Sequence, residues 1–267
     1  MLIQKLDVER LKREFQSAKP FPHIAIDNFL DPDFAKEVAA AYPTFEQAEK
    51  LGHQFAAVNE RRKIQISEEE KFPEPVRRLS EALSSPELRK QLAEISGIDN
   101  LLWDPSHAGG GMHMTGPHGH LDVHVDFNQL EGQKLVRRLN LLVYLNPKWQ
   151  EEWGGAVEIW DEDVKACYGA FPPVLNRAVM FATSATSWHG VTAVTCPPGF
   201  TRNSFAVYYY TEAVPTWFKA AHSTIFRARP DEHVKKYVLM PAQHAKDALK
   251  EGGNIARRLG EKILGRR

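Results

Sequence analysis

Histidines gather in one short stretch of the sequence, and one of them begins a pattern that suits a metal ion. The sharpest feature is His124-Val125-Asp126, because residues i and i+2 of a strand point to the same face about 6.6 Å apart. An imidazole and a carboxylate placed in this way can bind one cation. A surface polar pair, or a core histidine bonded to its neighbour, is the competing interpretation. Five of the eleven histidines fall between residues 107 and 124, namely His107, His113, His118, His120 and His124.

A third ligand is expected from a second strand. The apolar run of residues 178–183 is followed by Ser187-Trp188-His189, which places another imidazole near the end of that strand. Two histidines and one carboxylate that leave three positions open form the facial triad typical of non-haem Fe(II). A structural zinc site is more often closed by four ligands and is richer in cysteine. The three residues together therefore favour an iron site.

An arginine at the start of a later strand predicts an anion site beside this metal. Arg202 lies thirteen residues after His189, and its guanidinium can hold the distal end of a dicarboxylate in a bidentate ion pair. On another strand, alternation places Arg138, Asn140 and Tyr144 on one face. There the Tyr144 hydroxyl and the Asn140 amide can hydrogen-bond the same carboxylate. The alternatives are a strand-end arginine at the surface for Arg202 and a sheet aromatic packed against helices for Tyr144.

Short β-rich runs between residues 101 and 212 must position these side chains. Gly, Pro, Asn and charged turns separate the runs, which predicts an antiparallel sandwich or jelly roll rather than a βαβ fold. Residues 1–100 are mainly helical, with helices expected at 5–16, at 31–43 and, as a pair, within 68–98, and with a strand-like stretch at 24–27. We therefore expect one composite domain over residues 1–267, mainly β with flanking helices. It comprises a helical N-terminal layer (1–100), a β core (101–212) and a basic helical tail (213–267).

Charge and composition exclude several classes of protein. Lys+Arg and Asp+Glu are both 34, so the formal net charge is zero, which argues against nucleic acid or an anionic membrane as the main partner. The two cysteines, Cys167 and Cys196, are too few for a disulfide-rich module. The charged N-terminus lacks the apolar stretch of a signal peptide, and no apolar run approaches about 18 residues, so we expect a cytoplasmic protein without a membrane span.

The tail carries an excess of positive charge. Residues 213–267 contain twelve Lys or Arg and five Asp or Glu. The basic residues near the end of the chain are candidates for contact with a carrier protein or a phosphate, and a solvated helix end is the competing interpretation. These residues are Arg257, Arg258, Lys262, Arg266 and Arg267.

Several motifs, taken in order, resemble the Fe(II)/2-oxoglutarate-dependent oxygenases, specifically the prolyl 4-hydroxylase-like branch. The resemblance covers about residues 107–211 and rests on HVDF, RRLNLLVYLN, WGGAVEIW, NRAVMF, WHGV and TRNSFAVYYYT, with PFPHIAIDNFLDPDFAKEV as a similar lead-in. It implies a double-stranded β-helix (jelly-roll) core and the use of Fe(II), 2-oxoglutarate and O2. It also implies that His124, Asp126 and His189 bind the iron. Arg202 and Tyr144 would bind the distal carboxylate of 2-oxoglutarate, with Asn140 as a further candidate.

The activity implied by the resemblance is hydroxylation of an unactivated C–H bond, with release of succinate and CO2. The resemblance implies a small-molecule, amino-acid or peptide substrate, and it leaves open a prolyl or other peptidyl side chain, a free amino acid, a natural product or a sugar. Halogenating relatives have a small residue where this chain has Asp126, which favours hydroxylation. Candidates for the substrate pocket are Arg138, Trp160 and His120. A second His-x-Asp pattern, which ends at Asp122, is disfavoured because the residues after Asp126 fit the family better.

Two other functions compete with this one. The first is a non-catalytic metal-binding β-sandwich that acts as an interaction module through its basic tail. The second is a cupin-like metalloenzyme that does not use 2-oxoglutarate. A complete triad together with Arg202 argues against the first, because a degenerate member is expected to have lost at least one of these residues. The cosubstrate-binding arginine argues against the second. The sequence does not indicate an oligomeric state.

Overall fold

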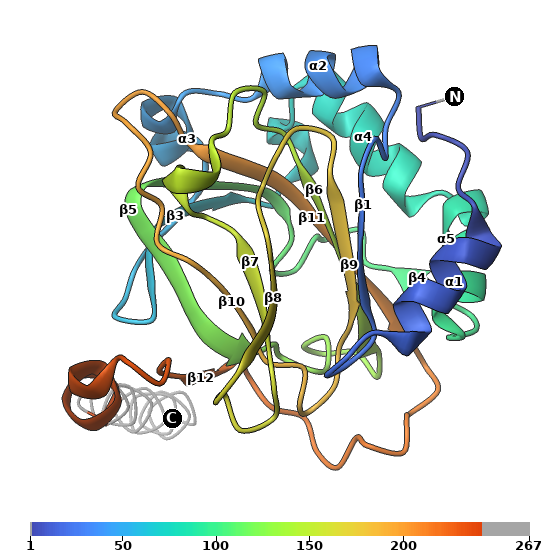
Figure 1. The fold of residues 1–267 in the computed structure, drawn as a ribbon. Helices are drawn as coiled ribbons and strands as arrows, with labels where there is room; N and C mark the ends of the chain where they lie inside the picture. Colours follow the sequence, from blue (N-terminus) through green and yellow to red (C-terminus); the bar gives the residue numbers. More distant parts are fainter. Residues whose placement is uncertain (1, 242–267) are drawn as a thin grey trace, which may run out of the picture.

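A strongly curved antiparallel sheet forms the centre of the protein in the computed structural model, which describes residues 2–241 (Figure 1). The strands follow the order β1-β9-β6-β11-β5-β10-β7-β8. The two end strands approach each other, since the rings of His23 in β1 and Phe171 in β8 lie 5.7 Å apart. This nearly closed antiparallel sheet confirms the predicted jelly-roll class. The bounds are β1 His23–Ile26, β9 Ala178–Ala182, β6 Val136–Tyr144, β11 Arg202–Thr211, β5 Gly111–Val125, β10 His189–Val191, β7 Val157–Trp160 and β8 Cys167–Phe171.

Strand β9 is apolar on both faces because both of its faces are covered. In β9, Ala178 and Met180 belong to the main core beneath the helices, whereas Val179 and Phe181 join Tyr144 of β6 in a cluster on the inner face of the curved sheet. Alternate residues of a strand point to opposite faces. One short strand can therefore pack against the helical layer with one face and line the inside of the curved sheet with the other.

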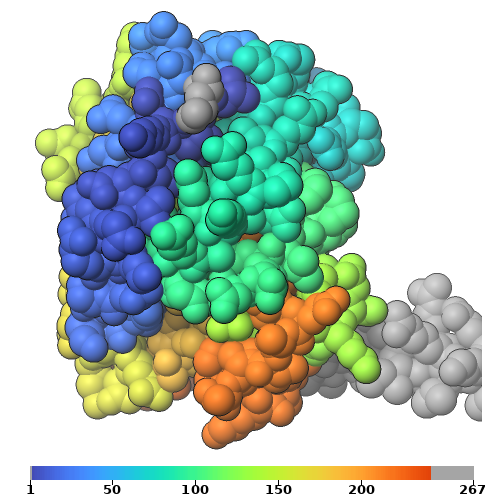
Figure 2. All heavy atoms as spheres, turned by 90° about the vertical axis from the view of Figure 1, so that its right-hand side faces the viewer, coloured from blue at the N-terminus to red at the C-terminus, as the bar shows by residue number. Residues whose placement is uncertain are grey.

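Helices from the N-terminal part of the chain pack against the outer face of the sheet (Figures 1 and 2). Their starts carry strong local signals: the Asp31 side chain accepts hydrogen bonds from the backbone N–H groups of Asp33 and Phe34, and Ser85 caps the helix that begins at Pro86. The helices predicted at 5–16, at 31–43 and within 68–98 are confirmed. The bounds are α1 Val8–Ser17, α2 Pro32–Ala41, α3 Phe45–Leu51, α4 Glu74–Ser84 and α5 Pro86–Ser96, with 3-10 turns at Glu69–Lys71 and Glu151–Trp153.

The structure contains a hairpin within the N-terminal layer that the sequence analysis does not predict. Strands β2 (His53–Ala56) and β3 (Glu60–Ile66) pair with each other, and β3 also pairs with β5. Only Ile64 and Ile66 of β3 are fully buried. The local apolar pattern is therefore too short to indicate a strand, and long-range pairing with β5 decides the conformation.

The segment after residue 212 also differs from the prediction. The sequence predicts helix throughout 213–267, but residues 213–241 contain the short strand β12 (Ile225–Arg227), which pairs with β5, and a π-helix (Lys235–Leu239). The strand β4 (Leu102–Trp103) likewise pairs at the edge of β11. The rest of the tail, including the basic residues from Arg257 to Arg267, lies outside the described residues. Within residues 2–241, no helix is long and apolar enough to cross a membrane.

Candidate active site

Two neighbouring strands bring the predicted metal ligands together. His124 lies near the end of β5, Asp126 follows that strand directly, and His189 begins β10. His189 and His124 are antiparallel partners with ring centroids 4.2 Å apart. The Nε2 atoms of His124 and His189 lie 3.5 and 3.4 Å from the two carboxylate oxygens of Asp126. One ligand atom from each residue lies within 4.8 Å of the others, a spacing at which the three can hold one metal ion.

The backbone fixes which nitrogen of each imidazole faces Asp126. Nδ1 of His124 lies 2.8 Å from the carbonyl oxygen of Asp122, and Nδ1 of His189 lies 2.9 Å from that of Ser187. A carbonyl can only accept, so each Nδ1 carries the proton and each Nε2 presents a lone pair. Burial and the neighbouring His124 lower the pKa of His189 to about 3. Both features prepare the pair for metal binding, which needs neutral imidazoles.

Asp126 is held by two side chains from β6. Asn140 Nδ2 donates to Oδ2 at 2.8 Å, and Arg137 Nη2 lies 3.2 Å from the same oxygen. The Arg137 guanidinium lies over the rings of Phe127 and Tyr208, 4.7 and 3.4 Å from their centroids. Burial raises the pKa of Asp126, but the nearby charge of Arg137 opposes this effect, and the pKa lies well below its usual value. The carboxylate is therefore ionised and oriented.

A second cation lies buried on the neighbouring strand. Arg202, 4% exposed, begins β11; its Nε donates to the carbonyl oxygen of Gly155 at 2.6 Å, and its Nη2 donates to the Tyr144 hydroxyl at 3.1 Å. Among residues 2–241, no carboxylate forms an ion pair with this guanidinium. Burial lowers the pKa of Arg202 and raises that of Tyr144. Because the Tyr144 oxygen accepts from Arg202, its own proton is free to be donated elsewhere.

A cavity of about 290 Å³ connects the two regions. It is lined by the three candidate ligands, by Arg202 and Ser204 of β11, and by side chains from β3, β5, β6 and β12. Tyr144 is fully buried and reaches this cavity only through its contact with Arg202. A ligand that contacts Arg202 and the triad together can therefore be enclosed within one site.

His113 adds a neutral polar group to the cavity wall. Its Nε2 lies 3.1 Å from the carbonyl oxygen of Gly109, to which it donates. Burial, followed by the charges of Lys63 and Arg202, lowers the pKa of His113 well below 6.5. The ring is therefore an uncharged hydrogen-bonding group at the active site.

A bulge in β6 overturns the prediction that Arg138 faces the cavity. Neighbouring residues of β11 pair with Leu139 and Arg137, so Arg138 is left without a partner. A bulge of this kind shifts the alternation by one residue. Arg137 therefore joins Asn140 on the cavity face, while Arg138 donates to the Thr211 hydroxyl on the other side.

Two other predicted residues differ in their surroundings from the sequence-based expectation. Asn140 lines the cavity, but its amide is engaged by Asp126 and Arg137 rather than lying beside Arg202. Trp160 does not line the cavity; alternation along β7 turns its side chain to the outer face of the sheet, where it joins a buried cluster with Trp188 and Val123. His120 does line the cavity, and its Nε2 lies 3.1 Å from a backbone carbonyl of the β2–β3 hairpin.

Three further residues, Arg137, His113 and Phe226, also line the cavity. Regular alternation along β6 does not place Arg137 on the cavity face, because the bulge shifts the register. For His113, the long and irregular strand β5 separates it from His124, so alternation does not predict that the two share a face. Phe226 lies in β12, a strand that only its pairing with β5 reveals. The clustering of histidines between residues 107 and 124 includes His113, but it does not show which of them face the cavity.

Comparison with known proteins agrees with this geometry. Residues 110–210 match the family described as the 2OG-Fe(II) oxygenase superfamily. No curated protein sequence matches the chain. The matched segment contains every candidate ligand and Arg202, and the resemblance to the 2OG-Fe(II) oxygenases noted from the sequence is confirmed.

Solved structures with a similar fold share little sequence. A prolyl hydroxylase from Trichoplax adhaerens, in complex with a peptide fragment of hypoxia inducible factor, is 18% identical with a TM-score of 0.53, over 76% of this chain and 90% of that one. A Pseudomonas putida prolyl-4-hydroxylase is 16% identical with a TM-score of 0.51, over 75% and 98%. The non-heme alpha ketoglutarate dependent carbocyclase SnoK, from nogalamycin biosynthesis, is 15% identical with a TM-score of 0.50, over 87% and 90%. At these identities the likeness establishes the fold.

Proposed function

We propose that this chain, whose residues 110–210 match the 2OG-Fe(II) oxygenase superfamily, is a 2-oxoglutarate-dependent dioxygenase that hydroxylates an unactivated C–H bond. The family uses Fe(II), 2-oxoglutarate and O2, and the reaction releases succinate and CO2. The observation that carries the proposal is the buried guanidinium of Arg202, which lines the same cavity as the triad and forms no ion pair with a carboxylate among residues 2–241.

Burial of the Arg202 guanidinium lowers the stability of the fold unless an anion binds beside it. A buried charge without a partner loses its hydration and destabilises the fold, whereas a well-placed carboxylate compensates for that loss. The Gly155 carbonyl and the Tyr144 hydroxyl accept hydrogen bonds from the guanidinium but carry no negative charge, so neither neutralises it. The distal carboxylate of 2-oxoglutarate supplies the missing charge, and the Tyr144 O–H can donate to it.

The donor set of the triad fits Fe(II). Two imidazole nitrogens and one carboxylate oxygen on one side of an ion leave its other positions free for a cosubstrate and O2. Asn140 and Arg137 keep Asp126 ionised and oriented, and the carbonyls of Asp122 and Ser187 fix the imidazole tautomers. Bound Fe(II) supplies the activation of O2 that is coupled to oxidative decarboxylation of 2-oxoglutarate. The protein supplies orientation and a cavity that limits access of water.

For the substrate, we propose a peptidyl or amino-acid side chain or a natural product, as in a prolyl 4-hydroxylase-like enzyme. This finer assignment is supported by the order of the sequence motifs and by the similar fold of two prolyl hydroxylases and one carbocyclase. His120 is the substrate-pocket candidate that remains from the sequence, because it lines the cavity.

Anaerobic absorption spectroscopy tests the proposal. Fe(II) followed by 2-oxoglutarate is added to the metal-free protein, and the weak visible charge-transfer band of the chelated keto acid is recorded. We expect the band in the wild type, its loss in His124→Ala, and a large rise in the 2-oxoglutarate concentration needed to produce it in Arg202→Ala. Removing one partner of a buried charge pair costs about 2–5 kcal/mol.

The matched control is Arg138→Ala, which removes an arginine that lies outside the cavity. Tight Fe(II) binding without a band in the wild type would contradict the use of 2-oxoglutarate and favour a cupin-like metalloenzyme. Absence of both Fe(II) binding and the band would refute the oxygenase assignment. If the band develops but no substrate in a broad panel stimulates succinate formation, the peptidyl, amino-acid and natural-product assignments are rejected for the compounds tested.

A further inference from the structure

The strand β12 covers the triad from the side opposite β10. It pairs with β5 in a register that places Phe226 opposite His124, and directly opposed residues of an antiparallel pair share a face. The two rings are tilted, with centroids 5.5 Å apart. Thr224 and Phe226 both line the cavity, whereas Ile225, between them, is 46% exposed. One short strand therefore contributes a wall of the candidate active site.

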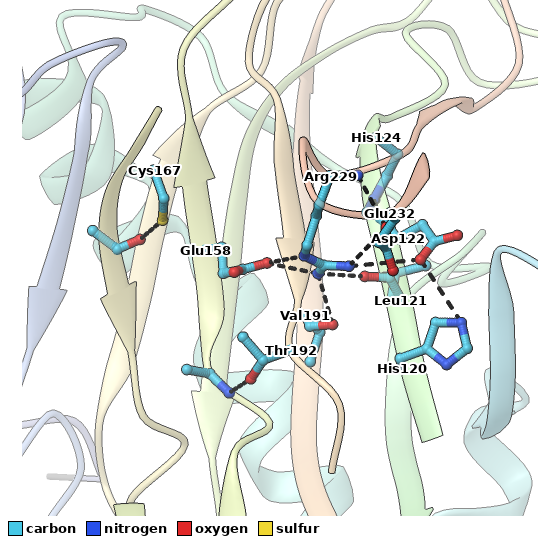
Figure 3. Close-up of polar contacts among 12 residues, drawn as sticks. His120, Leu121, Asp122, His124, Glu158, Cys167, Val191, Thr192, Arg229 and Glu232 are labelled. Atoms are coloured by element: carbon cyan, nitrogen blue, oxygen red, sulfur yellow. Dashed lines mark hydrogen bonds and ion pairs between the residues drawn. The ribbon is translucent and has the colours of Figure 1, made fainter. Parts of the chain in front are cut away.

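One arginine just beyond β12 reaches across three strands of the sheet (Figure 3). The Nε and Nη2 of Arg229 donate to Glu158 of β7 at 2.9 and 2.6 Å. Nη2 also donates to the carbonyl oxygen of Val191 in β10 at 3.1 Å and lies 3.5 Å from that of Leu121 in β5. These strands include the two that carry His124 and His189. Gly190 leaves room for this crossing, since a Cβ there would lie 3.1 Å from Nη2 of Arg229.

A buried carboxylate gives the same segment a second attachment. Asp122 is fully buried, and its Oδ1 accepts from Lys235 Nζ at 2.7 Å and lies 3.6 Å from Nη1 of Arg229. Lys235 also pairs with Glu232. An uncompensated carboxylate at this depth is strongly destabilising. The cations that compensate Asp122 come chiefly from the C-terminal segment, so burial of Asp122 and attachment of that segment require each other.

We propose that residues 222–235 form a latched wall of the active-site cavity, in which Phe226 shields the triad and Arg229 is the positioning residue that holds the wall closed. The shielding role rests on the metal site of the proposed function, whereas the latch rests on the ion cluster alone. Strands β10 and β12 both pair with β5, on opposite edges. The wall therefore narrows access to the metal site from the β12 edge of β5.

Hydrogen–deuterium exchange of the full-length protein tests the latch. In Arg229→Gln we expect amides of residues 222–235 to exchange at least about tenfold faster than in the wild type, because local opening no longer breaks the Glu158 contacts. Arg227→Gln is the matched control: it lies in the same segment, but its guanidinium contacts Trp188 and the carbonyl of Glu162 instead. Glu158→Gln removes the partner charge and should increase exchange in the same peptides. If Arg229→Gln does not fold, the exchange of the Glu158→Gln variant tests the latch. Unchanged exchange in a folded Arg229 or Glu158 variant would overturn the latch.

Removal of Co(II) by EDTA from the loaded protein tests the shielding role. Phe226→Ala should release Co(II) at least about tenfold faster than the wild type, because the chelator reaches the ion through the opened wall. Ile225→Ala is the control, since the neighbouring side chain faces the other way. Equal release from the two variants would overturn the shielding role. Failure of the wild type to bind Co(II) would instead refute the metal site, and the exchange measurement would still decide the latch.

Discussion

Two His-x-Asp patterns lie four residues apart on β5, and the protein uses them differently. His124 and Asp126 lie on the inner side of the sheet with His189, where a metal ion can bind. Asp122, from the pattern that begins at His120, is instead paired with Lys235 and the nearby Arg229. The same residue types at the same spacing therefore form a candidate catalytic site in one case and an attachment for the C-terminal segment in the other.

An irregularity in β5 explains the difference. His189 pairs with His124 and Val191 pairs with Leu121, so two steps along β10 correspond to three steps along β5. Regular alternation would place Asp122 on the same face as His124, but the extra residue of a bulge inverts the faces beyond it. Leu121 thus lines the cavity and Asp122 does not. Which carboxylate can bind a metal is decided by register rather than by the pattern.

The largest expected contrast is between Asp126→Asn and Asp122→Asn. Asp126→Asn removes the only carboxylate of the triad, and we expect Co(II) affinity to fall more than about a hundredfold. This loss exceeds the one typical of residues that only hydrogen-bond a metal ligand. Asp122→Asn should leave that affinity nearly unchanged and lower the free energy of unfolding by about 1–3 kcal/mol, because Lys235 loses its ionised partner. Calorimetric titration with Co(II) and urea unfolding measure the two effects. Equal losses of affinity in both variants would contradict the assignment of separate roles.

A smaller contrast is expected between the adjacent arginines of β6. Arg137→Gln removes the charge that orients and ionises Asp126, and we expect a loss of Co(II) affinity of about 10–100-fold. Arg138→Gln is the matched control, because the bulge turns this side chain towards Thr211. The same calorimetric titration compares them. A greater loss in Arg138→Gln would show that β6 has the regular register that the sequence alone predicts.

Much of the fold follows from local signals in the sequence. The capped helices and the short β-rich runs are recognisable because each has its own apolar pattern and its own turn or cap residues. The hairpin of β2 and β3 and the strand β12 are not, since their conformation depends on pairing with β5 rather than on their own side chains. Strands with two buried side chains, as in β3, or with none, as in β2 and β12, give little periodic signal.

The candidate site shows the same division. His124, Asp126, His189 and Arg202 were predicted and lie around one cavity, because their spacing within strands and the order of motifs are both informative. The bulges in β5 and β6 leave no local mark in the sequence. They decide that Asp122 faces away from the cavity, and that Arg137 replaces Arg138 there.

The smallest effect concerns His113, a neutral group on the inner side of β5. In the unfolded chain its pKa is near 6.5, whereas in the folded protein burial and nearby cations hold the pKa well below that value. Between the two pKa values the unfolded state binds more protons, so the stability contributed by His113 is present above about pH 6.5 and is lost as the pH falls below it. Lowering the pH from about 7.5 to about 5.5 should therefore cost the wild type up to about 1.4 kcal/mol through this residue.

Urea unfolding of the metal-free protein at both pH values measures this cost against His113→Gln, which keeps a polar side chain that does not titrate. The pH-dependent loss of unfolding free energy should be smaller in the variant by that amount, whatever the substitution does to stability at neutral pH, because only the difference between the two pH values reports the proton. An identical loss in both proteins would mean that His113 takes up a proton in the folded state. It would then be a cation beside Arg202 and Lys63, and the cavity would be more positive than the neutral imidazole implies.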